Sequence, residues 1–153
     1  MTNIYNRHYF DIEIEKKFNE VQRSGNHLSL ILFDIDHFKL INDKYGHIIG
    51  DDSLIFLSNL IKNHIRIYDT FCRWGGEEFM IITQNSLEET IKIAEHLRKI
   101  VDDETKNEDK VPHFSCSFGI VTLNEFDNIR DAINKVDKLL YKSKENGRNM
   151  VSY

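Results

Sequence analysis

Apolar residues recur every three or four positions in four segments of the chain, and this spacing places them on one face of an α-helix. The first segment ends near Gly25, and Gly147 closes the last. Ser86 and Glu89 have the spacing of a capping box, which marks the start of the third. The apolar positions of the four predicted helices are Phe10, Ile14, Phe18 and Val21; Leu54, Leu57, Ile61 and Ile65; Leu87, Ile91, Ala94, Leu97 and Val101; and Ile129, Ile133, Val136 and Leu140.

Continuous apolar runs lie between these helices and predict buried strands. The run "HLSLILFDID" (27–36) ends in acids, and "HFSCSFGIVTL" (113–123) predicts a later strand. The stretches "DTFCRW" and "EEFMIIT" flank Gly75 and Gly76, which predicts a tight hairpin of two strands. A short final strand is predicted around residues 150–152.

A short helix is predicted from Phe38 to Tyr45, directly after the first strand. Asp36 is in a position to act as its N-cap, and Gly46 is in a position to stop it. The stretch "GHIIGDD" (46–52) is predicted to form a turn before the next helix.

The order of elements is helix, strand, two helices, hairpin, helix, strand, helix and strand. The predicted fold class is therefore α+β: a ferredoxin-like split βαβ core (β-α-β-β-α-β) with an antiparallel central sheet flanked by helices, extra N-terminal and C-terminal helices and a short final strand. A right-handed crossover leaves a gap between the first two strands, which the third strand fills antiparallel to the first. The end of the first strand, with Asp34 and Asp36, should therefore meet the start of the third, with Glu77 and Glu78.

Composition narrows the class of protein but does not identify it. One domain is the natural count for 153 residues, with 41% apolar and 29% charged residues. The net charge of −5 argues against a general nucleic-acid or anionic-membrane binder, because those depend on broad positive fields. Cys72 and Cys116 lie in apolar runs and are interpreted as core residues of a reducing cytoplasm. No segment has transmembrane length, and the first residues do not form a signal peptide.

Two pairs of acids brought to one sheet edge suit a hard cation such as Mg²⁺, which prefers oxygen ligands. Strand alternation places Asp34 and Asp36 on the same side and Ile35 on the other, although the Ile35 carbonyl can still be a ligand. Glu77 and Glu78 should point in opposite directions, so at most one is a principal ligand. The alternative is a solvated turn at the rim of the sheet, with the acids facing water.

The hairpin resembles the signature G-G-[DE]-E-F of the GGDEF-domain diguanylate cyclases, which reads here Gly75-Gly76-Glu77-Glu78-Phe79. Three more blocks are similar to those of the family, in the same order: "DIDHFKLINDKYGHIIGDD" (34–52), "SFGI" (117–120) and "VDKLLYKSKENGRN" (136–149). The resemblance covers nearly the whole chain. It implies a single GGDEF domain over residues 1–153, excised from a longer bacterial protein with an N-terminal sensory or regulatory region.

The resemblance implies that two GTP molecules condense to cyclic di-GMP and two pyrophosphates. Each domain binds one GTP, so catalysis needs a homodimer in which two domains face each other. The implied cofactor is Mg²⁺ or Mn²⁺, two ions per active half-site. The implied metal ligands are Asp34, the carbonyl of Ile35 and Glu77. Glu77 is also the implied catalytic base, Glu78 assists the second metal, and Lys39 stabilises negative charge on the phosphates.

The resemblance also implies the substrate contacts. Asn42 and Asp51 would read the guanine, because a carboxylate can accept from its N1–H and N2–H₂ groups. Phe38 and His47 would contact substrate, and Lys144 and Arg148 would bind the β- and γ-phosphates. Each has an ordinary alternative: helix capping for Asn42 and Asp51, an exposed helix lysine for Lys39, turn packing for His47 and favourable charge at a helix C-terminus for Lys144 and Arg148.

A second site is implied by "RIYD", because Arg66 and Asp69 match the family's R-x-x-D inhibitory motif, five residues before the double glycine. Bound cyclic di-GMP would hold two domains in an unproductive arrangement. Arg98, from a neighbouring domain, would complete this site. The alternative for Arg66 and Asp69 is a local salt bridge.

The sequence departs from the family at its start, where Asn3 replaces a glycine and a leading Asp is absent, and Val136 and Leu140 replace alanines. None of these changes removes an implied ligand. The competing interpretation is a binding module that holds cyclic di-GMP or GTP without catalysis. A different nucleotidyl cyclase on the same sheet is the third. We expect a cytoplasmic domain that contacts neither nucleic acid nor membrane, although its parent protein can be membrane-anchored.

Overall fold

A computed structural model describes residues 2–153; Met1, the first residue of the expected domain, lies outside this range. In the described residues, the helices are too short or too polar for any of them to cross a bilayer. The elements along the chain are α1 (Arg7–Ser24), β1 (Ser29–Ile35), α2 (Phe38–Tyr45), α3 (His47–Lys62), β2 (Thr70–Gly75), β3 (Glu78–Thr83), α4 (Leu87–Lys106), β4 (Cys116–Thr122), a 3₁₀ turn η1 (Leu123–Glu125), α5 (Ile129–Glu145) and β5 (Val151–Ser152).

The five strands form one sheet in the order β2-β3-β1-β4-β5. β3 lies between β2 and β1 and is antiparallel to both, and β1 is also antiparallel to β4. β5 extends the sheet by pairing parallel to β4. This order is the ferredoxin-like arrangement, so the predicted α+β class and the predicted insertion of the third strand are confirmed.

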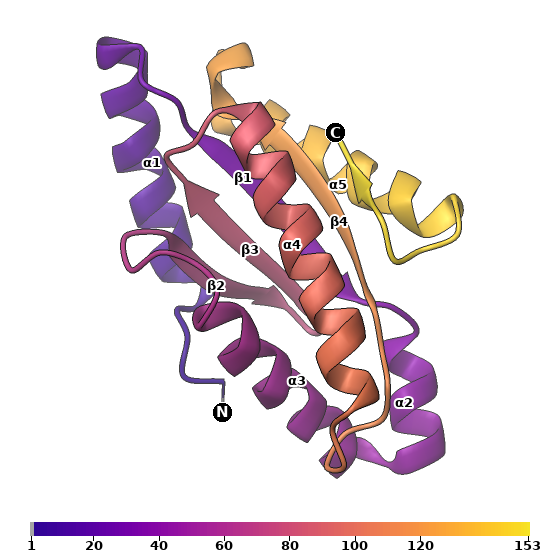
Figure 1. The fold of residues 1–153 in the computed structure, drawn as a ribbon. Helices are drawn as coiled ribbons and strands as arrows, with labels where there is room; N and C mark the ends of the chain where they lie inside the picture. Colours follow the sequence, from indigo (N-terminus) through magenta and orange to yellow (C-terminus); the bar gives the residue numbers. More distant parts are fainter. Residues whose placement is uncertain (1) are drawn as a thin grey trace.

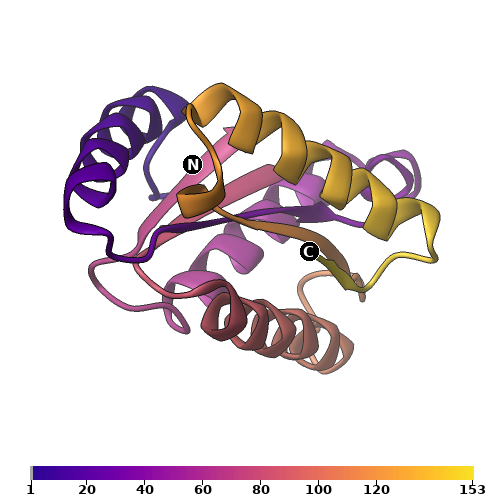
Figure 2. The same ribbon diagram turned by 90° about the horizontal axis from the view of Figure 1, so that it is seen from above.

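Helices cover both faces of the sheet, as Figures 1 and 2 show: α1 and α5 on one face, α3 and α4 on the other. β1 is buried along its whole length, and its residues alternate between the two cores. Ile31, Phe33 and Ile35 pack in the core with α3 and α4, whereas Leu30 and Leu32 pack with α1 and α5. Residue 34 therefore faces α5, and this direction decides what its carboxylate meets.

The predicted turn at residues 46–52 is wrong, because α3 begins at His47 and includes Gly50 and Asp51. Gly50 is disfavoured in a helix by roughly 1 kcal/mol relative to alanine. Packing explains its presence, since a Cβ at Gly50 would overlap Oδ1 of Asn42 and lie 3.4 Å from the Phe38 ring. Gly50 therefore leaves room for the Asn42 side chain, which a larger residue at position 50 would have to displace.

The predicted N-cap of the short helix is also wrong. Residue His37 occupies the N-cap position of α2 with φ of 57°, and no side chain caps the helix. Asp36 instead accepts three hydrogen bonds from residues far away in the sequence, at the start of neighbouring β4 and in the turn after α5. The other caps are as predicted: Gly25 ends α1 with φ of 70°, and Ser86 and Glu89 form the capping box of α4.

The segment before α1 joins the edge of the sheet beside β2. The Tyr5 N–H donates to the Phe71 carbonyl (3.3 Å), and the Tyr5 carbonyl accepts from the Arg73 N–H (2.9 Å). Tyr5 thereby forms a parallel bridge with Cys72. Cys72 and Cys116 are both free and buried, as predicted.

Candidate active site at the end of β1

The strand register confirms that acids of two neighbouring strands meet where β1 ends and β3 begins. Asp34 on β1 lies directly opposite Glu78 on β3. Directly opposite residues of an antiparallel pair project to the same face, so both side chains lie on the side of α5. Glu77 precedes β3 in the hairpin turn, so strand alternation does not fix its direction as the sequence suggested.

Asp34 is the most buried acid of the site, with 3% of its side chain exposed. Its Oδ2 pairs with the Lys144 ammonium from α5, and its Oδ1 is buried with no hydrogen-bond partner among residues 2–153. Burial raises the pKa of Asp34 to about 7; Lys144 lowers it, and the charges of Asp36 and Glu77 raise it further. No group in the described part of the chain thus satisfies this buried oxygen.

Glu78 is partly buried, and this burial is the largest cause that raises its pKa. The nearby Lys144 opposes the shift, whereas Asp137 and Glu77 add to it. Glu78 and Lys144 line a hollow of about 210 Å³ together with residues of α5, namely Asp137, Lys138, Leu140 and Tyr141. The site therefore holds several negative charges, and Lys144 is the cation that pairs with Asp34.

The residues present fit a hard divalent cation. Asp34 Oδ1 is an unsatisfied carboxylate oxygen, and the carboxylates of Glu77 and Glu78 are at the same sheet edge. Within residues 2–153, no three Asp, Glu, His or Cys side chains already form a metal-holding group. A full coordination sphere would therefore need backbone oxygens, such as that of Ile35, water and the phosphates of a ligand, which is how Mg²⁺ is commonly held.

Asp36 is buried like Asp34, but both of its carboxylate oxygens accept hydrogen bonds from the protein. Oδ2 accepts from the Ser115 hydroxyl (2.6 Å) and the Asn149 N–H (3.0 Å), and Oδ1 accepts from the Ser117 hydroxyl (2.6 Å). Sequence analysis placed Asp36 beside Asp34 in the acid cluster. The structure confirms the shared side of the strand and assigns Asp36 to the C-terminal turn.

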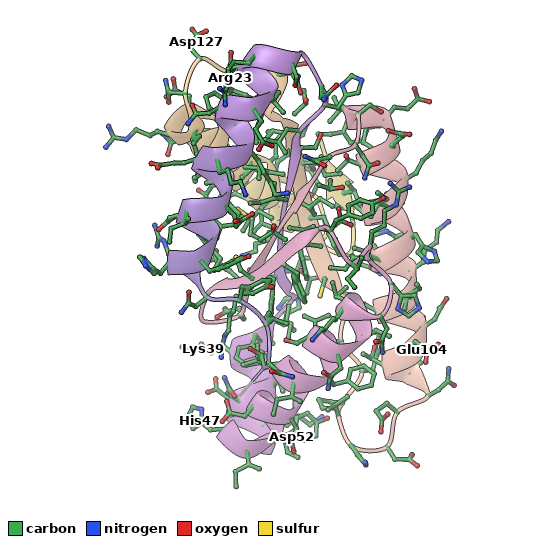
Figure 3. The ribbon with its side chains drawn as sticks, turned by 90° about the vertical axis from the view of Figure 1, so that its left-hand side faces the viewer. Arg23, Lys39, His47, Asp52, Glu104 and Asp127 are labelled. Atoms are coloured by element: carbon green, nitrogen blue, oxygen red, sulfur yellow. The ribbon has the colours of Figure 1, made fainter. Side chains whose placement is uncertain are left out.

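The side chains implied for nucleotide contact come from α2 and α3, which meet below the end of the sheet. Figure 3 shows Lys39 on α2 and His47 at the start of α3 at the same end of the molecule, with Arg23 and Asp127 at the opposite end. Lys39, His47 and Asp51 are exposed. Phe38 and Asn42 are half-buried, and both side chains lie beside Gly50, where α2 meets α3.

Lys144 and Arg148 lie where α5 ends and the chain turns toward β5. α5 lies close to β4, since a Cβ at Gly119 would be 2.5 Å from the Val136 carbonyl oxygen and 2.6 Å from the Leu140 nitrogen. After the helix, Gly147, Arg148 and Asn149 all have positive φ, of 117°, 65° and 46°. Lys144 reaches Asp34 from α5, whereas Arg148 lies within this left-handed turn.

Arg66 and Asp69 form a tight turn between α3 and β2. Asp69 Oδ2 accepts from the Arg66 backbone N–H, and the Asp69 N–H donates to the Arg66 carbonyl, both at 3.0 Å. The guanidinium donates to Asn85 Oδ1 (3.2 Å), so within the described chain the two side chains form no salt bridge. Within the residues that the structure describes, Asp69 Oδ1 is buried and has no hydrogen-bond partner. Both residues line a cavity of about 640 Å³.

Arg98 on α4 bonds elsewhere within its own domain. It donates to Glu95 (3.0 Å), to Asn149 Oδ1 (3.0 Å) and to the Asn149 carbonyl (3.4 Å). The sequence predicts that Arg98 completes the second site of a neighbouring domain. These contacts lie within one domain, so this role of Arg98 stays a prediction. Its contact with Asn149 and the structural role of Gly50 were missed, because neither has a signal in local periodicity.

The fold and site define a ferredoxin-like α+β protein with an acidic, cation-compatible edge beside a glycine-rich hairpin. The family model "Diguanylate cyclase, GGDEF domain" matches residues 1–150. This chain belongs to that family.

Relatives match over almost the whole chain. Diguanylate cyclase A of Treponema denticola is 36% identical over 99% of this chain and 43% of its own length, and diguanylate cyclase VdcA of Vibrio cholerae is 35% identical over 99% and 45%. The chain thus spans less than half of these curated relatives.

Solved structures agree with the fold over the full chain. The active GGEEF domain of a diguanylate cyclase from Vibrio cholerae has a TM-score of 0.91 at 33% identity, covering 98% of this chain and 97% of that one. The coiled coil and GGDEF domain of DgcB from Caulobacter crescentus, in complex with c-di-GMP, has a TM-score of 0.90 at 29% identity, covering 99% and 82%.

Proposed function

We propose that this domain is a metal-dependent diguanylate cyclase that condenses two GTP molecules into cyclic di-GMP and two pyrophosphates. The observation that carries the proposal is the buried, unpartnered Oδ1 of Asp34, directly across the sheet from the Glu78 of an intact Gly75–Phe79 signature. A carboxylate oxygen buried without a partner is costly unless a ligand completes it. In this family the matching ligand is a cation with its nucleotide.

The acids at the sheet edge bind and orient the reacting groups. Asp34, Glu77 and the Ile35 carbonyl would hold Mg²⁺ or Mn²⁺, two ions per half-site, with Glu78 assisting the second. The ions, when bound, neutralise phosphate charge and lower the pKa of the attacking 3′-hydroxyl. Glu77, in the hairpin turn rather than in β3, can approach that hydroxyl and accept its proton.

Lys144 has a second task in this proposal. Without ligand it pairs with Asp34, which compensates the buried carboxylate. Lys144 keeps 32% of its side chain exposed. If Asp34 held a cation, the Lys144 ammonium would be able to turn toward the β- and γ-phosphates. Arg148 grips the same phosphates, and Lys39 stabilises the negative charge that develops during transfer.

Guanine is recognised at the contact of α2 and α3. Asp51 accepts from the base N1–H and N2–H₂ groups, and Asn42 pairs with another part of the base edge. Phe38 and His47 flank the base or sugar. Adenine has neither N1–H nor a 2-amino group and would leave Asp51 unpaired, so GTP is preferred over ATP.

The reaction needs two domains, because each supplies one GTP and a single site cannot form both new bonds. We propose a homodimer as the active form and product inhibition at Arg66 and Asp69. The 640 Å³ cavity and the unpartnered Asp69 Oδ1 support a ligand there, and Arg98 of a neighbouring domain was the sequence-predicted third contact. We further propose a cytoplasmic location for the domain, without contact to nucleic acid or membrane.

The test is synthesis itself. Concentrated protein is incubated with GTP and Mg²⁺ or Mn²⁺ and the products are analysed by mass spectrometry. We expect cyclic di-GMP from the wild type and none from Glu77→Gln, with unchanged melting of that variant. Glu88→Gln, which removes an exposed acid of α4, is the matched control and should retain full synthesis.

Folded wild type that yields no cyclic di-GMP at any protein concentration would contradict the proposal and favour a binding module. Full synthesis by Glu77→Gln would remove only the role given to that residue.

A further inference from the structure

We propose that Asp36 and Arg98 are positioning residues for Arg148. They hold the left-handed turn after α5 in the one shape that presents the Arg148 guanidinium to the phosphates of GTP. This role rests on the proposed function, in which Arg148 binds those phosphates.

The turn is unfavourable by itself. Arg148 and Asn149 adopt φ of 65° and 46°, directly after Gly147 at 117°. Left-handed backbone costs a non-glycine residue roughly 1–2 kcal/mol, and such residues persist only where their surroundings over-determine them. Asparagine tolerates the region better than arginine does. Arginine at the strained position therefore indicates that its side chain has a use there.

Asp36 holds the turn from the sheet. Its Oδ2 accepts from the Asn149 N–H at 3.0 Å, while Ser115 and Ser117 fix the carboxylate with two hydroxyl bonds of 2.6 Å. The carboxylate is 5% exposed, so water does not replace these bonds easily. A charge-assisted bond to a backbone N–H is stronger than a neutral one.

Arg98 holds the same residue from α4. One nitrogen of its guanidinium donates to both the Asn149 Oδ1 and the Asn149 carbonyl, and its Nε donates to Glu95. The turn is closed on its remaining sides by the Arg148 N–H on the Ser143 carbonyl (2.9 Å) and by the Phe118 N–H on the Met150 carbonyl (2.9 Å). Asn149 is thus held by two ionic side chains from opposite directions.

The Arg148 guanidinium itself makes no hydrogen bond or ion pair with any residue between 2 and 153. Every contact at the turn therefore fixes the backbone and leaves the cation available. Loss of Asp36 or Arg98 should weaken phosphate binding although neither touches the nucleotide.

The experiment measures equilibrium affinity for a non-hydrolysable GTP analogue by calorimetry, together with KM, kcat, the inhibition constant for cyclic di-GMP and the melting temperature. In Arg98→Ala we expect analogue affinity to fall and KM for GTP to rise roughly tenfold, with kcat changed less than about twofold. Arg98→Lys should recover part of the affinity, because it keeps one donor.

Lys99→Ala, on the exposed side of the same helix, is the matched control and should match the wild type. Asn149→Gly keeps the left-handed backbone but removes Oδ1, so Arg98→Ala should cost less on that background than alone. Asp36→Asn keeps the shape and loses one acceptor, and should weaken analogue binding roughly threefold. It also decides the case if Arg98→Ala does not fold.

A wild type that binds no analogue would defeat the proposed function. A wild type that binds and synthesises, with Arg98→Ala and Asp36→Asn both binding equally well, would overturn the positioning role alone. A changed inhibition constant with unchanged KM in Arg98→Ala would also overturn it, in favour of the sequence-based inhibitory role of Arg98.

Discussion

Two carboxylates, two residues apart on the same side of β1, meet opposite fates. Both carboxylate oxygens of Asp36 accept hydrogen bonds from the protein. In Asp34, Oδ2 pairs with the partly exposed Lys144, and Oδ1 has no partner among the described residues. Both are buried, so burial alone does not separate a structural acid from a functional one. The difference is whether residues of the protein supply hydrogen bonds to both carboxylate oxygens. Only Asp34 keeps a carboxylate oxygen available to a ligand.

The largest expected effect is on activity at Asp34. Asp34→Asn should reduce cyclic di-GMP synthesis more than about 100-fold, because a neutral amide cannot replace a carboxylate that holds a cation. Melting should change little, since the freed Lys144 can reach water. Synthesis is followed by mass spectrometry and melting by circular dichroism. Retained synthesis would erase the functional side of the contrast.

Asp36→Ala should act on stability. Removing the carboxylate leaves the buried Ser117 hydroxyl, the half-buried Ser115 hydroxyl and the Asn149 N–H without their acceptor, which should cost about 2–4 kcal/mol of the free energy of unfolding. Urea unfolding measures this. If Asp36→Ala were no less stable than Asp34→Asn, the two acids would not differ as described.

Gly50→Ala tests a contact that serves both packing and recognition. The new methyl would overlap Asn42 Oδ1, so we expect a loss of about 1–2 kcal/mol, reduced by the helix propensity of alanine, and a higher KM for GTP. Asn59→Ala, at an exposed position of the same helix, is the control for a substitution in α3. Equal KM in the two variants would argue against an Asn42 role.

The smallest effect is expected at a fully exposed acid with no role in the site. The Ser86 backbone N–H donates to Glu89 and lowers the pKa of that carboxyl below its ordinary value of 4.5. The folded pKa is depressed, so the stabilisation is present above about pH 4.5 and is lost as pH falls through the lower folded value. Wild type should therefore have a higher urea midpoint than Glu89→Gln at pH 6, and this difference should shrink at pH 3.

Local patterns in the sequence sufficed for most of the fold. The apolar runs of β1 and β4, the glycine hairpin and the Ser86 capping box each depend on neighbours in sequence, and each is confirmed. The crossover rule placed Asp34 beside Glu78 without any contact information. The start of α3 was missed because Gly46 and Gly50 suggested a turn. In the structure Gly50 lies within the helix, next to the side chain of Asn42.

The division of labour between Asp34 and Asp36 could not be predicted. It depends on Ser115, Ser117 and Asn149, which lie about 80 to 113 positions away along the chain. No periodicity carries such pairings. The same holds for Arg98, whose partner Asn149 is 51 positions distant.

Gly119 sets a distance that no side chain could adjust. The backbone of α5 lies against the backbone of β4 at this residue. The distance from Lys144 to the end of β1 therefore depends on residue 119 having no side chain. A methyl group at residue 119 would act as a wedge under the helix. It would carry the lysine away from Asp34 and leave every residue of the signature sequence in place.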